Sequence, residues 1–208
     1  MNSKILFIGP IVIFVVLVLT FTFLAVSTYN ASEPLGTLRR FSSLLPKVFQ
    51  LVAFGGLLSI VATIGMKRIR SNILVYPPLF LILLDLDHLP SLFGIDQPIR
   101  PAHSLIFLLI SLIAIFAFES RRPAIPLTLM SSFLGHLGLD SPLFPLFAPI
   151  SSELYSFSTI ISMTLVLSSI ILAMISGRMY QRAESEKNDR LEFSITDAPS
   201  TQLSRDCS

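Results

Sequence analysis

The sequence predicts an all-α membrane protein, a polytopic bundle of about six transmembrane helices. Hydrophobic residues make up 52% of its 208 residues and charged residues only 13%, and the mean hydropathy is +0.76. Several apolar runs approach the roughly 20 residues that a helix needs to cross a bilayer. The runs lack the alternation of barrel strands, and hydrocarbon offers the backbone no hydrogen bonds, so we expect each run to be a helix.

The first apolar run follows Lys4 and precedes the small-residue sequence AVS, as the core of a signal peptide would. It is longer than the roughly 7–15 apolar residues of a usual signal peptide, so we expect an uncleaved anchor. Cleavage would leave the topology of the other spans unchanged. Within a membrane-embedded domain of residues 1–180, the predicted spans cover about residues 5–27, 48–66, 72–88, 103–118, 123–139 and 157–176.

The third span, residues 72–88, is the least regular of the six. Its Pro77-Pro78 pair removes two backbone donors, which disfavours a regular helix at that point. Because the apolar part of this span is short, Asp85 and the next carboxylate lie in the outer margin of the membrane or belong to a re-entrant segment. The re-entrant arrangement would put the arginines at positions 121 and 122 outside, against the charge bias, and we rank it second.

Lysine and arginine residues near the span ends orient the predicted bundle. With the N-terminus inside, the cytoplasmic side carries eight of them and the outer side four, which favours an N-in and C-in topology. The inner set is Lys4, Lys67, Arg68, Arg70, Arg121, Arg122, Arg178 and Arg182, and the outer set is Arg39, Arg40, Lys47 and Arg100. The formal net charge of +2 is too small to indicate a nucleic-acid partner.

After Gly177 the composition becomes polar and poor in apolar residues. Such a segment buries too little surface to offset its ordering entropy. We therefore predict a cytoplasmic tail over residues 181–208, helical at first and largely disordered. The single cysteine, Cys207, lies in this tail, so the chain has no internal disulfide.

All three histidines lie at the outer ends of consecutive predicted spans, and two of them have a carboxylate close in sequence. In LLDLDHLP, Asp85 and His88 are three apart, and His136 and Asp140 are four apart, spacings that share one face of a helix. In RPAHS, an arginine precedes His103 by three positions. An ionisable side chain at bilayer depth costs on the order of 3 kcal/mol, so we expect these groups to pair, to face water or to bind something.

This joint pattern predicts a site for a divalent metal ion at the outer face. Zinc is the preferred ion, because His and Asp side chains are common zinc ligands, and manganese is the alternative. The predicted ligands are Asp85, His88, His103, His136 and Asp140, and the catalytic candidates are Asp87, Arg100 and His103. Asp87 would orient a ligand histidine or take a proton from water, and Arg100 would clamp an anionic group such as a phosphate. His103 is either a ligand or an acid/base. Taken singly, each residue also fits an ordinary capping, interfacial or snorkelling side chain.

Three segments resemble, in their order and spacing along the chain, motifs of the YdjM-like family of membrane-bound, metal-dependent hydrolases. This family is LexA-regulated in some bacteria. The three segments read LLDLDHLP, RPAHSLIFLL and SSFLGHLGLDSPLFPLFAP. The family shows a D-I/L-D-H segment, an H-R-G-x-T-H-S segment and a G-Y-L-S-H-x-x-x-D segment followed by proline and aromatic residues. The resemblance covers about residues 83–149, a third of the chain. The matching residues are Asp85, Asp87, His88, Arg100, His103, Ser104, His136 and Asp140.

Two departures from the family pattern concern histidines. Ile99 stands at the first histidine of the second family segment, and Pro101 and Ala102 stand at its glycine and threonine. The family also tends to carry an early histidine on its first core helix, and residues 48–66 contain none. A site with fewer imidazoles would bind one metal where relatives bind more, or would have lost catalysis. The family is thought to be akin to the helical fold of zinc-dependent phospholipase C and P1 nuclease, and this kinship implies phosphoester hydrolysis.

We therefore expect a multi-pass protein of the cell membrane that hydrolyses a small phosphoester or lipid-linked substrate at the outer face with metal-activated water. Membrane lipids are the expected partners, and no nucleic acid is expected. The alternative is a metal- or lipid-binding membrane protein that has lost catalysis, which the two departures favour. A transporter or channel ranks last, because the strong charges lie on one side and the inner halves of the spans are apolar.

Overall fold

The chain folds into an all-helical bundle in this computed structural model, and the predicted all-α fold class is confirmed. The residues described are 3–28, 41–66, 71–88, 90, 100–118, 123–140, 143–148, 150–151 and 153–196. Across these residues the long helices are α1 (Ser3–Thr28), α2 (Phe41–Thr63), α3 (Ser71–Leu84), α5 (Leu105–Phe118), α6 (Ala124–Leu139) and α7 (Thr159–Thr196). The short elements are the 3₁₀ helices η1 (Asp85–His88) and η2 (Pro101–His103) and the strands β1 (Leu143–Phe144) and β2 (Tyr155–Ser156).

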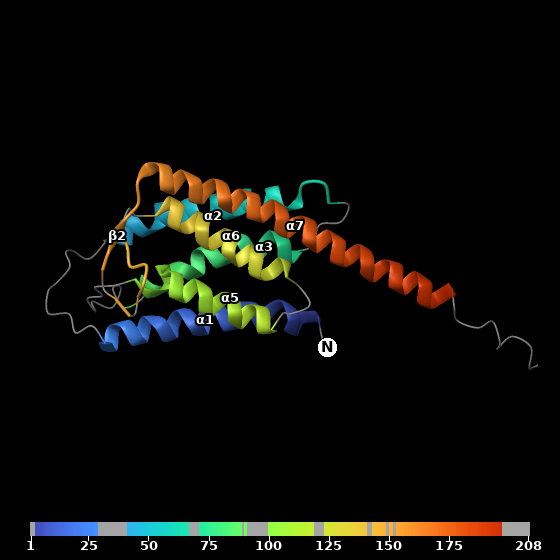
Figure 1. Cartoon of the computed structure of the whole chain (residues 1–208), viewed down its shortest axis with the longest axis horizontal. Helices are drawn as coiled ribbons and strands as arrows, with labels where there is room; N and C mark the ends of the chain where they lie inside the picture. The colour runs from blue at the N-terminus through green and yellow to red at the C-terminus, as the bar shows by residue number, and fades with distance from the viewer. Residues whose placement is uncertain are drawn as a thin grey trace, which may run out of the picture.

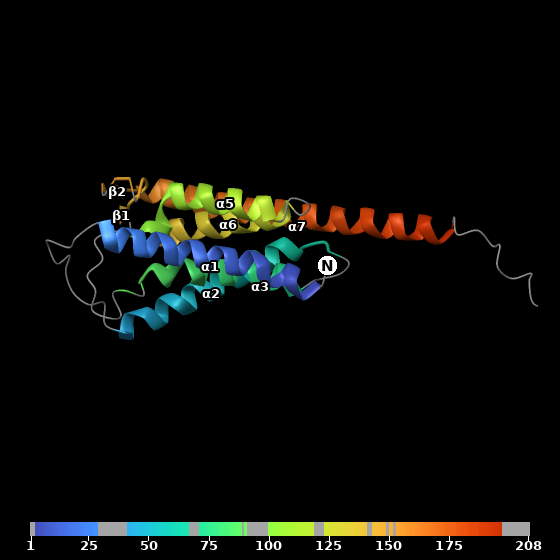
Figure 2. The same ribbon diagram turned by 90° about the horizontal axis from the view of Figure 1, so that it is seen from below.

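The helices run side by side, with α6 in the middle of the bundle (Figure 1). α6 packs along α7 and also contacts α3 and α5, while α2 packs against α3 and α7. α1 packs against α5 and reaches both short 3₁₀ helices. Figures 1 and 2 place the β1–β2 hairpin at one end of the bundle and the start of α1 at the other. The C-terminal half of α7 projects beyond the bundle at the same end as the start of α1.

Two apolar clusters hold the bundle together, and α3 contributes to both. In the first cluster, the rings of Phe14 and Phe80 meet edge to face with their centroids 5.1 Å apart, and Phe107 meets Phe14 at 5.5 Å. The second cluster joins α2, α3 and α7 around the buried Leu58 and Leu81. Edge-to-face contacts add to the hydrophobic gain of burying the rings. The end of α3, where η1 begins, is therefore fixed from both sides.

The prediction that Pro77 and Pro78 would disfavour a regular helix is wrong, because α3 continues through both of them. A proline at position 78 leaves the carbonyl of Leu74, four residues earlier, without its helical N–H donor. The Ser59 hydroxyl of α2 lies 2.9 Å from that carbonyl oxygen and can donate to it. A side chain on Gly55 would collide with Pro78, so the glycine allows the close helix contact that brings Ser59 into range.

Much of the apolar surface of the bundle faces outward. In the described part of the chain, Thr159–Glu186 is the one helical segment both long and apolar enough to cross a membrane. Four further helical segments are apolar but shorter, namely Ile8–Leu24, Val48–Thr63, Leu105–Phe118 and Ala124–Leu139. By length and composition, therefore, α7 is the one described helix that could cross a membrane.

α7 extends well past the span predicted over residues 157–176. The tail was predicted to be helical at first, and its first part continues this helix as far as Thr196. Glu186 precedes Arg190 by four positions, a spacing of opposite charges that supports a solvated helix. The rest of the predicted tail, residues 197–208, lies outside the described residues.

Candidate metal centre

The predicted site residues come from three elements that meet at the hairpin end of the bundle. α3 tightens into η1 directly after the buried Leu84. In a 3₁₀ helix, residues three apart lie on the same side, and Nε2 of His88 is accordingly 3.6 Å from Oδ1 of Asp85. His136 lies in the last turn of α6, and the backbone N–H of Asp140 closes that helix by donating to the His136 carbonyl.

His103 is held in place by a capped helix start. It ends η2, and the next residue, Ser104, accepts a hydrogen bond from the backbone N–H of Phe107 at 3.1 Å. This is the N-cap bond of α5, a contact that typically contributes about 1 kcal/mol. The Ser104 hydroxyl also donates to the carbonyl of Pro101 at 2.8 Å. Ser104, which matches the family motif, therefore has a structural contact that fixes its histidine neighbour.

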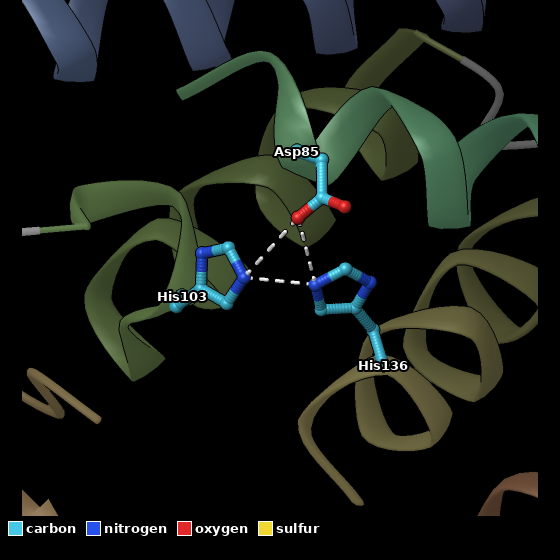
Figure 3. A group of neighbouring side chains, drawn as sticks. All are labelled: Asp85, His103 and His136. Carbon is cyan, nitrogen blue, oxygen red and sulfur yellow. Dashed lines mark hydrogen bonds and ion pairs between the residues drawn. The ribbon is translucent and has the colours of Figure 1, made fainter. Parts of the chain in front are cut away.

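Asp85, His103 and His136 point toward one another from η1, η2 and α6 (Figure 3). Nε2 of His103 and Nε2 of His136 are 2.8 Å apart, and Oδ1 of Asp85 is 3.4 Å from the His136 nitrogen and 3.9 Å from the His103 nitrogen. All three ligand atoms lie within 4.8 Å of one another. Both imidazoles are fully buried. This buried Asp/His group could hold a metal ion.

Asp87 lies behind His103 and is itself fully buried. The Nδ1 atom of His103 is 2.9 Å from Oδ2 of Asp87, so an Nδ1–H donates to the carboxylate. That bond places the proton on Nδ1 and leaves the Nε2 lone pair directed at the other two ligand atoms. A carboxylate that orients a metal-binding histidine in this way is a common feature of metal sites. The geometry fits one of the two roles predicted for Asp87.

Arg100 makes its contacts inside the site. Its Nη1 donates to Oδ2 of Asp140 at 2.5 Å, and its Nη2 lies 3.3 Å from Oδ1 of Asp85 and 2.8 Å from Nε2 of His103. The guanidinium thus shares acceptor atoms with any metal ion bound there. With carboxylates ionised and imidazoles neutral, the charges of Asp85, Asp87, Asp140 and Arg100 leave two negative charges, the number that a divalent cation neutralises.

His88 and Asp140 occupy the edge of the site. The side chains of His88 and Arg100 are 21% and 19% exposed, so they mark its open side. Oδ2 of Asp140 is 3.3 Å from Nε2 of His103 and 4.0 Å from Nε2 of His136. Asp85 and His88 also form a second potential metal group with Asp87.

The structure thus brings all the predicted site residues into one region. Among the described residues, the groups that could hold a metal ion contain only the predicted ligands and Asp87, which was predicted to orient a ligand histidine. Sequence reasoning missed that Asp85 belongs to both groups and that Arg100 pairs with the carboxylates, and neither fact follows from spacing along the chain. No protein-family model, no curated protein and no solved structure matches the chain.

Proposed function

We propose that the chain is a membrane-bound, metal-dependent hydrolase, a divergent relative of the YdjM-like family, that cleaves a phosphoester or lipid-linked substrate at the outer membrane face. The observation that carries this proposal is the convergence of two imidazole nitrogens and one carboxylate oxygen within 4.8 Å at a buried place. Buried ionisable groups are costly unless they are paired or bind something, and these three come from separate elements.

The donor set favours zinc over other divalent ions. Asp85, His103 and His136 would hold the ion, since two nitrogens and one oxygen suit zinc and leave a fourth position for water. Manganese is the second choice, because Asp140 and the other carboxylates supply further oxygen donors nearby. When bound, such an ion supplies a Lewis acid that activates water and polarises a phosphoryl oxygen.

The side chains around this group would divide the remaining work. Asp87 holds the proton of His103 at Nδ1, which keeps the opposite nitrogen free to bind. Arg100 approaches from the open side, so its guanidinium is placed to bind an anionic group of the substrate when it leaves Asp140. His88, whose side chain is partly exposed on the same side, is the candidate to exchange a proton with water or substrate.

A multi-pass arrangement with both ends of the chain inside agrees with the shape of the bundle. α7 meets the requirements for a membrane crossing, and the shorter apolar helices run alongside it. The start of α1 and the far half of α7 lie at one end of the bundle, and the hairpin lies at the opposite end (Figure 1). With the polar half of α7 in the cytoplasm, the metal centre faces the outside.

The direct test is to purify the protein in detergent, determine its metal by elemental analysis and assay lipid and soluble phosphodiesters. We expect about one equivalent of zinc and hydrolysis that stops with chelator and returns with zinc. His136→Ala should abolish both, while Leu127→Ala, a half-buried position nine residues earlier on the same helix, should retain both. Full activity of the double variant His88→Ala/His136→Ala would refute the proposal.

A metal-binding membrane protein without turnover is the second candidate function. Arg100 favours it, because its guanidinium already bonds Asp85 and Asp140 and is not directed at an external anion. Ile99, which replaces a family histidine, favours it too. This candidate predicts stoichiometric metal in the purified protein and no hydrolysis of any ester in a broad panel.

A further inference from the structure

The segment that joins α6 to α7 is a small hairpin with an apolar surface. β1 pairs with β2 in antiparallel register, Leu143 with Ser156 and Phe144 with Tyr155. Between the strands, Ile150 is 81% exposed, and Phe147 and Leu154 are each 44% exposed. Glu153 is the one charged residue in the sequence 143–156. Exposed aliphatic and phenyl groups gathered in one short segment mark a surface that something apolar covers.

The hairpin lies next to the point where the chain enters the membrane. β2 ends at Ser156, and the apolar segment of α7 that is long enough to cross a membrane begins at Thr159. Even a fully extended chain covers at most about 11 Å in three residues, so the end of β2 lies within that distance of the start of α7. The exposed apolar surface also continues from the hairpin onto α7, where Ile160 is exposed in turn.

Tyr155 has the contacts of a residue at a membrane–water boundary. Its ring meets the ring of Phe147 edge to face at 5.7 Å, while its hydroxyl donates to the carboxylate of Glu153 at 2.8 Å. One end of the side chain is therefore apolar and the other polar. Tyrosines of this kind collect at the headgroup level of membranes.

The hairpin is also fixed to the metal centre. The backbone N–H of Leu105, two residues after His103, donates to the carbonyl of Leu146 at 2.9 Å. Leu146 packs against the main apolar cluster, and Ala148 is fully buried. On the other side, β1 begins three residues after Asp140. The depth of the hairpin in a membrane therefore sets the depth of the metal centre.

We infer that the hairpin 143–156 is an interfacial anchor, which inserts Phe147, Ile150 and Leu154 into the headgroup–acyl boundary of the bilayer that α7 crosses. The partner is a lipid surface, because the apolar residues adjoin the membrane helix and carry a boundary tyrosine beside them. A second consequence rests on the proposed function: the open side of the metal centre meets lipid headgroups, so a headgroup phosphoester is the preferred substrate and a soluble phosphodiester is a poorer one.

The chain contains no tryptophan, so a single substitution creates a specific fluorescent reporter. Ile150→Trp protein would be reconstituted in vesicles of phosphatidylcholine and phosphatidylglycerol whose acyl chains carry bromine near the headgroup or near the methyl end. We expect blue-shifted emission that the shallow bromines quench more strongly than the deep ones. Asn188→Trp, in the polar part of α7 beyond Glu186, is the control and should be unquenched by either lipid.

Two outcomes would overturn the anchor. Unquenched emission at the wavelength of a water-exposed tryptophan would mean that the hairpin stays in solvent. Blue-shifted but unquenched emission would mean that protein, from a second copy or another chain, covers it. Bound metal measured in the same Ile150→Trp sample should equal the wild-type content, which shows that the variant is folded.

The proposal that the preferred substrate is a lipid headgroup is tested separately. The rates at which Ile150→Glu and the wild type hydrolyse vesicle lipids and a soluble phosphodiester would be compared. We expect about a tenfold loss on vesicles, the effect of losing one buried aliphatic side chain, and no change on the soluble ester. Equal losses on both substrates, or none, would overturn the headgroup assignment. Absence of any hydrolysis by the wild type would refute the proposed function and leave the quenching result to decide the anchor.

Discussion

Two regions of the bundle bury polar groups, and they do so in opposite ways. At the α6–α7 seam, formed by hydroxyl residues of both helices, the Ser131 hydroxyl donates to the Ser169 carbonyl at 2.8 Å and the Ser176 hydroxyl to the Ala124 carbonyl at 2.7 Å. The seam contains neutral groups only. At the metal centre, carboxylates, imidazoles and a guanidinium crowd together within a few ångströms.

The two regions differ in what their polar groups still need. Among the described contacts of the seam, Ser169 Oγ alone lacks a hydrogen-bond partner, and the other hydroxyls are satisfied by helix carbonyls. At the metal centre, Nδ1 of His136 and Oδ1 of Asp87 are buried without a partner. The unpartnered His136 nitrogen is on the other side of its ring from the converging Nε2, so the site carries more unsatisfied buried polar atoms than the seam does. The comparison distinguishes a helix contact of neutral hydroxyl groups from a buried group of ionisable side chains that could hold a metal ion.

The largest effect should follow removal of a ligand at the metal centre. His136→Ala deletes one of the two converging imidazoles, and we expect metal affinity to fall at least about 100-fold, measured by competition with a chromogenic chelator. Lowering the pH should also reduce the metal affinity of the wild-type protein, because protons compete with the metal for the imidazole nitrogens. If the metal affinity of His136→Ala were unchanged, the metal would bind elsewhere. The metal centre would then not differ from the α6–α7 seam in binding an ion.

Asp87→Asn should have the next largest effect. The amide keeps the shape of the side chain but loses the charge that holds the His103 proton at Nδ1. Loss of such a supporting carboxylate typically lowers metal affinity by about 10–100-fold. The chelator assay measures this change, and Ser132→Ala, a buried position elsewhere on α6, is the matched control with wild-type affinity. An effect no larger than that of the control would make Asp87 an ordinary buried partner.

Arg100→Gln should act in the opposite direction, and about tenfold. The guanidinium shares Asp85 and Asp140 with a metal ion, so its removal frees both carboxylates and takes away a repelling positive charge. The variant should bind the metal more tightly and lose any affinity for a phosphoester. This result would fit an Arg100 that moves between the ligand carboxylates and the substrate. Weaker metal binding would instead mean that Arg100 holds the carboxylates in position.

The smallest effect belongs to the seam. Ser131→Ala removes one satisfied hydroxyl and should lower the free energy of unfolding by about 1 kcal/mol, the usual net value of a hydrogen bond. Its metal affinity should equal that of the wild type. Denaturation in mild detergent, followed by circular dichroism, would measure the first quantity and the chelator assay the second. A change in metal affinity would show that the two regions are coupled through α6.

The site was largely predictable from the sequence because local spacing carried the signal. Asp85 and His88 share one turn of chain, as do His136 and Asp140, and strong polar groups stand out in apolar surroundings. The pairing of Arg100 with both carboxylates was not predictable, since it joins residues that only the folded bundle brings together.

The fold class followed from composition, but two local features did not follow from local rules. The helix continues through Pro77-Pro78, and Ser59 of another helix offers a donor to the Leu74 carbonyl, one of the two that the prolines leave without a helical partner; a propensity argument considers one helix at a time. The length of the helical start of the tail was not predicted, although opposite charges four positions apart, such as Glu186 and Arg190, favour a helix.

His103 and His136 are 33 residues apart in the chain, and Asp85 comes from yet another part of it. An ion held by all three would act as a further cross-link between elements that also meet through side-chain packing, hydrogen bonds and ion pairs. Closing such long loops restricts the unfolded chain far more than the folded one. Metal loading and assembly of the bundle would then be one linked equilibrium, with the loaded protein melting at a higher temperature than the same protein in chelator.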